Sequence, residues 1–438
     1  MRKLLTLAIS LTVISGLHAQ DELETADERF FAADTMADGG YVSRYPDGTI
    51  LYVGKVENGQ KQGVWKYYYP NGTLREMISF KDSKREGLSR KLDKYGVIIN
   101  EANYKNNILD GPYVEFYEDG TLALKGHYSS GKKDSTWIEY SPEGDVNYIK
   151  EFKLGKPDGK WTYTYSFGRV SAEEYYTIGI KTGTWKEYFP NKRLKKQFSF
   201  KNGLLDGAYK EYFESGAVSV EGTYKLGLKS GKWLSFVEPE KLYSIGDYVN
   251  DLKTGHWKYF KPNGALDYEG KFKNGLKEGQ WIYYHDSGKP RMIGSYVLDE
   301  KDGLWGLFYE NEQLQMEQMW KLGALLEVSP FYTSRGEELE SGGLTKGNGK
   351  LFMYHDDGTV ASDETYRNGQ LNGDAKYYFE DGTLQATGRY LNDQKTGTWQ
   401  EYNDKGRIIA EGAYTAGEMT GTWRFFNNRG KLIETVDY

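Results

Sequence analysis

The 438-residue sequence contains no cysteine. This absence excludes disulfides, and it excludes metal sites built on thiolate ligands. Proline is scarce at 10 residues, and leucine, isoleucine and valine are sparse for a chain of this length. After residue 19 no hydrophobic run is long enough to cross a bilayer. A large aliphatic core, a disulfide framework and a spanning helix are therefore all missing from the expected fold.

The sequence motifs of common catalytic sites are also missing. There is no Gly-x-Ser-x-Gly, no phosphate-binding glycine loop that opens a helix, and no His-Glu-x-x-His. The histidines after residue 19 are His127, His256, His285 and His355, and no further ligand recurs at a matching distance from them. We interpret the chain as non-enzymatic, with no catalytic residue, no cofactor and no metal, and we attribute His285 and His355 to variation beside a turn.

The charge balance argues against nucleic acid as a partner. The chain has 57 Lys and Arg against 63 Asp and Glu, which gives a net charge of −6. Sequence-independent binding of nucleic acid needs clustered basic residues, and a mildly acidic chain does not suit it.

The first 19 residues are typical of a secretory signal peptide. Arg2 and Lys3 precede an apolar stretch from Leu4 to Leu17, and Ala19 is a small residue at the expected cleavage point. We expect an exported protein that resides in the periplasm, in the outer envelope or outside the cell. Residues 20–38 form an acidic leader.

Glycine, with 53 residues, and tyrosine, with 38, are abundant instead, and they recur with a period of 24 residues. We number repeat positions from the glycine that opens each unit, for example Gly255 at position 0. Residues 39–326 contain repeats 1 to 12, residues 327–348 a degenerate repeat, and residues 349–438 repeats 14 to 17. A period of this length indicates a repeat architecture.

Each unit predicts one β-hairpin. The first strand occupies positions 1 to 6, with tryptophan at position 2 and an aromatic ring at position 5, and a turn with glycine at position 9 follows. The residues that define the repeat are Gly63, Trp65, Tyr68, Gly72, Gly231, Trp233, Gly255, Trp257, Phe260, Gly264, Gly279, Trp281, Tyr284, Gly397, Trp399 and Tyr402. Alternation would place positions 2 and 5 on opposite faces unless a bulge intervenes, and the sequence leaves this open.

The second strand alternates cleanly at positions 11, 13, 15 and 17, as in Leu122, Leu124, Gly126 and Tyr128. Because glycine at position 15 has no side chain to pack, we expect a ring from an adjacent strand to lie over it. A second turn, such as Asn274 to Glu278, leads to the next unit, and its lysines and acids predict a charged, solvated edge.

Short links between hairpins predict an antiparallel meander. The fold class is therefore all-β, an elongated array of consecutive antiparallel hairpins with about 17 units of 24 residues. Residues 327–348 interrupt the register. They are either a bend or hinge, or an insertion that binds a partner.

The segment Gly63-Val-Trp65-Lys-Tyr-Tyr68-Tyr-Pro-Asn-Gly72 resembles the bacterial variant of the MORN repeat family. This resemblance covers nearly all of the chain after the leader. It implies a scaffold of β-hairpins that has protein partners, or sometimes membrane lipids, as ligands. Bacterial members are often described as YwqK-type antitoxins, which neutralise a partner toxin.

We therefore expect an exported scaffold that binds a protein partner, of unknown identity, along an aromatic-rich sheet surface. Two alternatives stay open. One is an antitoxin or immunity protein with a single toxin partner. The other is an envelope protein associated with membrane lipid or glycan, although the acidic net charge of −6 disfavours anionic lipid.

Overall fold

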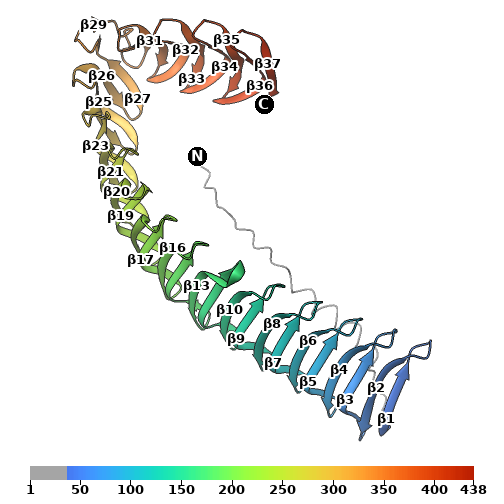
Figure 1. The fold of residues 1–438 in the computed structure, drawn as a ribbon. Coiled ribbons are helices and arrows are strands. Elements are labelled where there is room, and N and C mark those ends of the chain that lie inside the picture. Colours follow the sequence, from blue (N-terminus) through green and yellow to red (C-terminus); the bar gives the residue numbers. More distant parts are fainter. Residues whose placement is uncertain (1–36) are drawn as a thin grey trace. The chain divides into compact units, whose positions relative to one another are not determined.

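The computed structural model describes residues 37–438, and the predicted signal peptide and nearly all of the acidic leader lie outside them. The described residues form β-strands and one short 3-10 helix, η2 (Ser166–Gly168). Two compact units divide the chain after Gly168. Within each unit, Figure 1 shows strands that follow one another in chain order, so the expected all-β array of hairpins is confirmed.

The first unit is a single antiparallel meander in which each strand pairs with the next, except that β11 (Lys156–Pro157) and β12 (Gly159–Tyr165) both pair with β10 (Val146–Lys153). Its strands are β1 (Gly39–Arg44), β2 (Ile50–Glu57), β3 (Gln60–Tyr68), β4 (Leu74–Lys81), β5 (Lys84–Leu92), β6 (Ile98–Lys105), β7 (Ile108–Phe116), β8 (Leu122–Ser129), β9 (Lys132–Tyr140), β10 (Val146–Lys153), β11 (Lys156–Pro157) and β12 (Gly159–Tyr165).

The second unit begins with a meander of the same kind. Its strands are β13 (Arg169–Thr177), β14 (Ile180–Lys181), β15 (Gly183–Tyr188), β16 (Leu194–Lys201), β17 (Leu204–Tyr212), β18 (Val218–Lys225), β19 (Leu228–Glu238), β20 (Lys241–Val249), β21 (Leu252–Phe260), β22 (Leu266–Lys273), β23 (Leu276–Tyr284), β24 (Pro290–Val297), β25 (Glu300–Phe308), β26 (Leu314–Lys321) and β27 (Ala324–Val328).

The second unit ends with a two-stranded and an eight-stranded antiparallel sheet. The short pair is β28 (Phe331–Tyr332) and β29 (Glu338–Leu339). The strands of the larger sheet are β30 (Gly349–Tyr354), β31 (Val360–Arg367), β32 (Gln370–Tyr378), β33 (Leu384–Leu391), β34 (Gln394–Tyr402), β35 (Ile408–Thr415), β36 (Glu418–Phe426) and β37 (Leu432–Asp437).

Two kinds of turn alternate along the meander. The wide turn around position 9 is closed by backbone bonds, such as Gly264 N–H to the Lys261 carbonyl at 2.9 Å. The tight turn at positions 19 and 20 has only two residues, and both have positive φ, as in Asn274 (51°) and Gly275 (85°). This combination is typical of a type I′ hairpin turn, whose twist matches that of the strands.

The tight turn corrects one expected boundary. From the sequence, the first strand of a unit starts after the glycine at position 0, but β23 already starts at Leu276, three residues before Gly279. The reason is that the tight turn ends at Gly275, so the lysine and the acid that follow it are strand residues. The expected Asn-Gly-x-Lys-acid turn is therefore shorter than the sequence suggested.

Wide turns that lack glycine keep the same backbone geometry. Lys192, Glu240 and Glu312 occupy the place of the glycine, and their φ values are 71°, 63° and 67°. These residues adopt a left-handed conformation that a side chain disfavours. The surrounding hairpin therefore determines the turn more strongly than the local residue does.

The degenerate repeat contributes to the largest apolar cluster of the second unit. Its buried residues are Tyr309, Met316, Leu325, Phe331, Leu344, Leu351 and Tyr366. Backbone bonds tie the same region together, since Leu325 N–H donates to the Gly369 carbonyl at 2.9 Å and Gly369 N–H to the Gly347 carbonyl at 2.8 Å. Residues 324–348 are thus packed between the repeats on either side of them.

Candidate functional site

One face of the sheet is built from a repeated contact between tryptophan and glycine. A Cβ atom placed on Gly126 would lie within 3.0 Å of the Trp137 ring, so only glycine fits beneath that indole. The same contact joins Gly54 to Trp65, Gly222 to Trp233, Gly246 to Trp257, Gly270 to Trp281, Gly294 to Trp305, Gly388 to Trp399, and Gly412 to Trp423. The expectation that a ring from an adjacent strand covers position 15 is confirmed, and we call this side the tryptophan face.

The tryptophans of this face are structural. Trp281 is fully buried, and its indole N–H donates to the Lys271 carbonyl at 3.2 Å. Rings of the neighbouring strands surround it, with Phe272 at 5.1 Å and Tyr296 at 6.0 Å between centroids. Such ring pairs add stability beyond the area that they bury. The predicted repeat tryptophans therefore hold strands together and offer a partner little surface.

Positions 2 and 5 lie on opposite faces, which resolves the ambiguity in the sequence. The hydroxyl of Tyr284, at position 5, donates to Glu269 at 2.7 Å. Glu269 directly precedes Gly270 in β22, so it points away from the tryptophan face. The predicted residues Tyr68, Phe260, Tyr284 and Tyr402 are accordingly half-buried on the other side of the sheet.

The predicted glycines fall into two groups. Gly63, Gly231, Gly255, Gly279 and Gly397 lie inside strands with φ between 63° and 71°. In β23 the pairing with β22 passes from Trp281 to Glu278, so Gly279 and Gln280 form a bulge in that ladder. The second group, Gly72 and Gly264, supplies the positive φ of wide turns.

Lysines at position 22 form a regular row on the tryptophan face. Each ammonium group lies 4.1–4.8 Å from the centre of the tryptophan ring four residues later. The row consists of Lys61, Lys133, Lys181, Lys229, Lys253, Lys277, Lys301 and Lys395. Such cation–π contacts contribute about 0.5–2 kcal/mol each. This row is not among the features predicted from the sequence, although the Lys-x-x-x-Trp spacing recurs in it.

Four consecutive members of this row lack an acidic partner. None of the ion pairs in the described part of the chain includes Lys229, Lys253, Lys277 or Lys301. Burial lowers the pKa of Lys253, and the neighbouring charges of Lys229 and Lys277 lower the same pKa further. Lys253 and Lys277 donate to the hydroxyls of Tyr259 and Tyr283 at 2.5 and 3.1 Å. The face therefore presents positive charges with neutral donors beside them.

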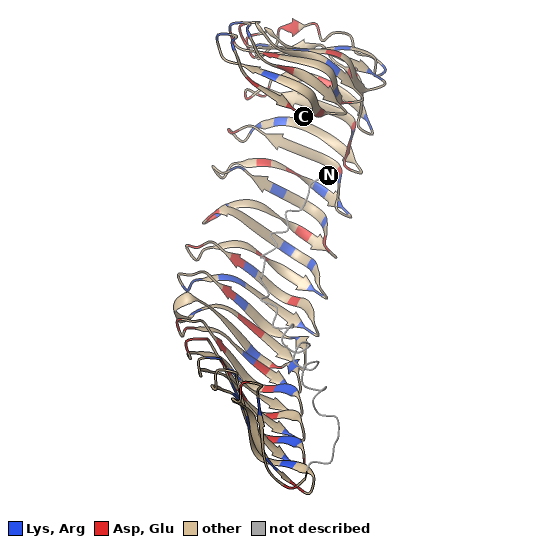
Figure 2. Ribbon diagram, turned by 90° about the vertical axis from the view of Figure 1, so that its right-hand side faces the viewer, with Lys and Arg blue, Asp and Glu red and all other residues tan. Residues whose placement is uncertain are grey.

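The opposite face carries charges of both signs, and Figure 2 shows basic and acidic residues interspersed over the strands. Glu269 accepts from His256 at 2.8 Å and from Lys258 at 3.2 Å. Burial opposes ionisation of Glu269, but bonds from Tyr284, His256 and Lys258 outweigh it and lower its pKa to about 2. The charge of Glu269 is thus neutralised by its neighbours on this face.

His285 and His355 join neighbouring repeats. Their Nε2 atoms donate to the carbonyls of Phe308 and Tyr378 at 2.8 and 2.9 Å. Tyr117 makes the equivalent bond to the Tyr140 carbonyl at 2.7 Å. The two histidines therefore replace tyrosine in a structural contact. In the described residues no group of three or more His, Cys, Asp or Glu could hold a metal ion, and no helix is long and apolar enough to cross a membrane.

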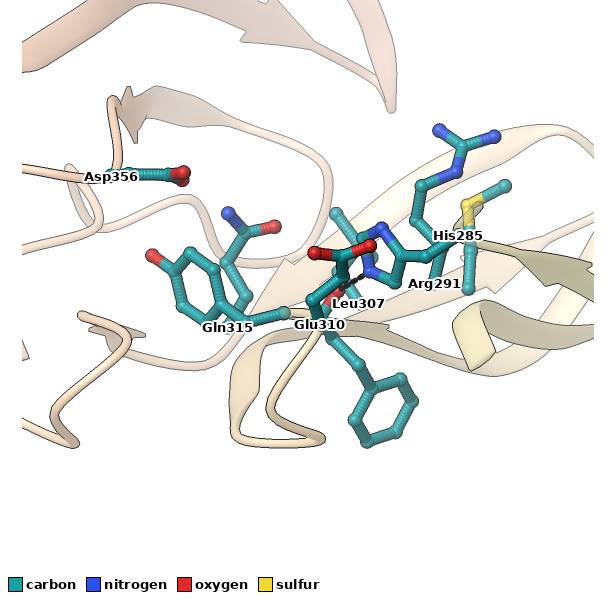
Figure 3. A pocket seen from close by; sticks show the side chains of 9 residues that line it. His285, Arg291, Leu307, Glu310, Gln315 and Asp356 are labelled. Atoms are coloured by element: carbon teal, nitrogen blue, oxygen red, sulfur yellow. Dashed lines mark hydrogen bonds between the residues drawn. The ribbon is translucent and has the colours of Figure 1, made fainter. Parts of the chain in front are cut away.

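One pocket of about 350 Å³ lies in the second unit beside the wide turns. It is lined by His285, Arg291, Met292, Leu307, Phe308, Tyr309, Glu310, Gln315 and Asp356. Figure 3 shows Asp356 approaching from the side opposite His285 and Arg291. Arg291, Glu310 and Asp356 all line the pocket, so its electrostatic potential is not dominated by one sign of charge. The sequence did not predict this pocket, because Asp356 reaches it only through the packing of residues 324–348.

The hairpin meander and its tryptophan–glycine register define a β-repeat protein. The family described as "MORN repeat variant" matches residues 61–82, 109–130, 181–202, 205–226, 253–274, 277–297 and 371–392. Each match starts at a position-22 residue such as Lys61 and ends near a tight turn. The chain is therefore a MORN-repeat protein. None of the curated proteins matches it.

Among solved structures, the crystal structure of TcdB2-TccC3 has 10% identity and a TM-score of 0.14, over 90% of this chain and 27% of that chain. A structure of the Photorhabdus luminescens Tc holotoxin pore has 11% identity and a TM-score of 0.11, over 91% and 25%. The chain thus spans about a quarter of the length of those chains.

Proposed function

We propose that this protein is an exported, non-enzymatic scaffold that binds a protein partner along the tryptophan face. The observation that supports this function most strongly is the run of ammonium groups from Lys229 to Lys301 without acidic partners. Successive members are two strands apart, which corresponds to about 10 Å. A partner with acidic side chains would neutralise charges that now repel one another.

The surroundings of the lysines support a protein partner. Tyr259, Tyr283 and Tyr296 border the row with half-exposed or nearly buried rings and hydroxyl groups. Tyrosine offers a large contact area and loses little conformational freedom on binding. Desolvated ammonium groups would then favour carboxylates over neutral groups.

The proposal is tested by an affinity pull-down of the chain against the envelope fraction of its own organism, read by mass spectrometry. We expect one stoichiometric acidic partner. The variant Lys253→Gln/Lys277→Gln/Lys301→Gln should lose it, because three of the positive charges are removed while side-chain length is nearly kept. Circular dichroism would show that the variant is folded, although the loss of three cation–π contacts should lower its melting temperature.

A matched control removes the same charge elsewhere. Lys232→Gln/Lys271→Gln/Lys273→Gln changes three exposed lysines outside the row and should retain the partner. If both variants bind equally well, the tryptophan face is not the binding surface. Recovery of lipid or background alone would overturn the protein-partner function, and a captured toxin that the chain neutralises would identify the antitoxin alternative.

Export is tested separately by locating the chain in cell fractions, with and without residues 1–19. The full chain should appear in the envelope or medium, and the shortened chain in the cytoplasm. Retention of the full chain in the cytoplasm would overturn the proposed export.

A further inference from the structure

The tight turns of the second unit present a row of exposed apolar side chains. In a meander all tight turns lie along one edge, because every second connection returns to the same side. Seven successive tight turns between β13 and β27 expose Ile178, Ile180, Leu204, Leu226, Leu228, Leu252, Leu276, Leu298 and Leu322. We call this set the tight-turn ridge. The edge was predicted to be charged and solvated, and its apolar side chains were not predicted from the sequence.

The ridge is continuous from one turn to the next. A Cβ atom placed on Gly203 would lie 3.7 Å from Ile180, and one on Gly227 would lie 3.8 Å from Leu204. Backbone bonds also link the turns, for example Gly227 N–H to the Leu205 carbonyl at 2.7 Å. The apolar residues are therefore held at a fixed spacing by the sheet.

Several ridge residues occupy backbone positions that suit them poorly. Ile178, Leu226, Leu298 and Leu322 stand at repeat position 19 with φ between 44° and 52°. Other repeats place asparagine there, as in Asn274 with φ 51°. Asparagine tolerates this conformation, whereas leucine and isoleucine are disfavoured in it. Leu226 is 68% exposed and Leu298 65%, so burial within this chain does not offset the strain.

We propose that the tight-turn ridge is an interface with a second copy of this chain, the two ridges packing edge to edge about a twofold axis. A second copy presents apolar tips at the same spacing as the first, so that the tips of one ridge can fit between those of the other. A twofold contact requires this self-complementarity. A stable dimer takes about 800 Å² from each partner, and nine half-exposed aliphatic side chains supply an area of that order.

The charges beside the ridge also suit a second copy. Asp206, Glu278 and Asp302 accept bonds from the backbone N–H groups of Leu226, Leu298 and Leu322 at 3.0–3.4 Å. Lysines at position 18 flank the same turns, namely Lys201, Lys225, Lys273 and Lys321. An edge with both signs can pair with itself in antiparallel orientation, whereas an anionic membrane would attract only the lysines.

The experiment is sedimentation velocity of the full chain over a wide range of concentrations. The wild type should sediment as a species with twice the mass of the monomer. Leu226→Asn/Leu298→Asn/Leu322→Asn introduces the residue that other repeats have at this position, so the turns should be retained or improved. Burial of each leucine corresponds to a factor of at least about 10 in affinity, so the variant should weaken the dimer at least ~1000-fold, while circular dichroism shows an intact sheet.

The matched control is Val64→Asn/Leu88→Asn/Leu304→Asn, which replaces three exposed apolar residues outside the tight turns and should leave the dimer intact. A monomeric wild type at all concentrations would overturn the proposal, and so would an undiminished dimer in the ridge variant. Binding of a monomeric wild type to vesicles of neutral and anionic phospholipid, lost in the ridge variant, would overturn it in favour of a lipid surface.

Discussion

Trp137 covers Gly126 so closely that the glycine has no room for a side chain. In one place the repeat changes both partners of this contact together. Where Ser89 replaces the tryptophan, Ile78 stands opposite it in the position of the glycine and is 4% exposed. Total side-chain volume is thus conserved across the pair of strands, as close packing requires.

This contact predicts a strong effect of Gly126→Val. The valine would overlap the indole, and either Trp137 or the β8 backbone must move. Overpacking of a core typically costs 1–3 kcal/mol, so we expect a loss of about 2–3 kcal/mol in the free energy of unfolding. Thermal and urea unfolding followed by circular dichroism will measure it. An unchanged melting temperature would show that the indole does not need the glycine.

The Ile78–Ser89 pair supplies the control. Gly126→Ile alone should destabilise at least as much as the valine, whereas Gly126→Ile/Trp137→Ser copies a pair that this chain already contains and should recover part of the loss. Because the two residues are in contact, their effects should be non-additive by about 0.5–3 kcal/mol. Additive effects would mean that the volumes are not coupled.

The features of this fold that could be predicted from the sequence are those that recur with the 24-residue period. Hairpins, their number and the ring over position 15 could be predicted, because each is repeated many times and elementary strand geometry then allows few arrangements. The start of β23 at Leu276 was placed wrongly, since the local Lys-Glu pair after Gly275 resembles turn composition. That boundary depends on the positive φ of both Asn274 and Gly275, which the tight hairpin imposes.

Contacts that occur once could not be predicted. The cluster around Phe331 and Leu344 forms where the 24-residue pattern is interrupted, so its residues do not recur at a repeat position that would predict it. The row of position-22 lysines was not predicted for a different reason. Lysine in a strand usually indicates solvent exposure, and only the distance from Lys253 to Trp257 reveals the contact. Whether residues 327–348 act as a hinge or bind a partner stays a prediction.

Glu269 predicts a specific loss of stability in acid. Its folded pKa of about 2 lies below the ordinary value of 4.5, because the bonds from Tyr284, His256 and Lys258 outweigh the effect of burial. The carboxylate therefore contributes stability that is fully present above pH 4.5 and is lost as the pH falls through about 2. Glu269→Gln should lower stability at neutral pH by about 1–3 kcal/mol.

Melting temperatures measured as a function of pH will test this prediction. The difference between wild type and Glu269→Gln should shrink as the pH approaches 2. A difference that stays constant down to that pH would show that the charge of Glu269 does not stabilise the fold. Glu434→Gln, on an exposed acid of β37, is the control for removing a carboxylate.

The raised pKa values of two tyrosines predict a loss of stability at alkaline pH. Burial, followed by a hydrogen bond to Glu173, raises the pKa of Tyr188 to about 12, and burial with a bond to Glu269 does the same for Tyr284. The folded state therefore keeps protons that the unfolded chain loses near pH 10. Stability should be present below pH 10 and be lost as the pH rises towards about 12.

The measurement combines melting temperature with the ultraviolet absorbance of tyrosinate. Ionisation in the folded protein should lag behind that of the unfolded chain, and Tyr188→Phe/Tyr284→Phe should flatten the alkaline loss of stability. If tyrosinate forms near pH 10 while circular dichroism shows an intact sheet, the hydroxyl groups are not protected as the structure indicates.

The burial of Phe331 predicts that its side chain stabilises the degenerate repeat and the contacts around it. The side chain is fully buried, and its ring lies 4.9 Å from that of Tyr354. Truncation of a buried phenylalanine typically costs 3–5 kcal/mol. Each hairpin of the array is stabilised mainly by its neighbours, so Phe331→Ala should release the contacts around Leu325 and Leu344 while distant repeats stay folded.

Hydrogen exchange will locate this effect. Residues 324–348 should lose protection in Phe331→Ala, and β34 to β36 should keep it. Phe167→Ala is the matched control, since that ring is 84% exposed and its removal should change stability by less than about 0.5 kcal/mol. Uniform loss of protection across β13 to β37 would instead show that the second unit unfolds as one cooperative block, and that the cluster around Phe331 stabilises every repeat in it.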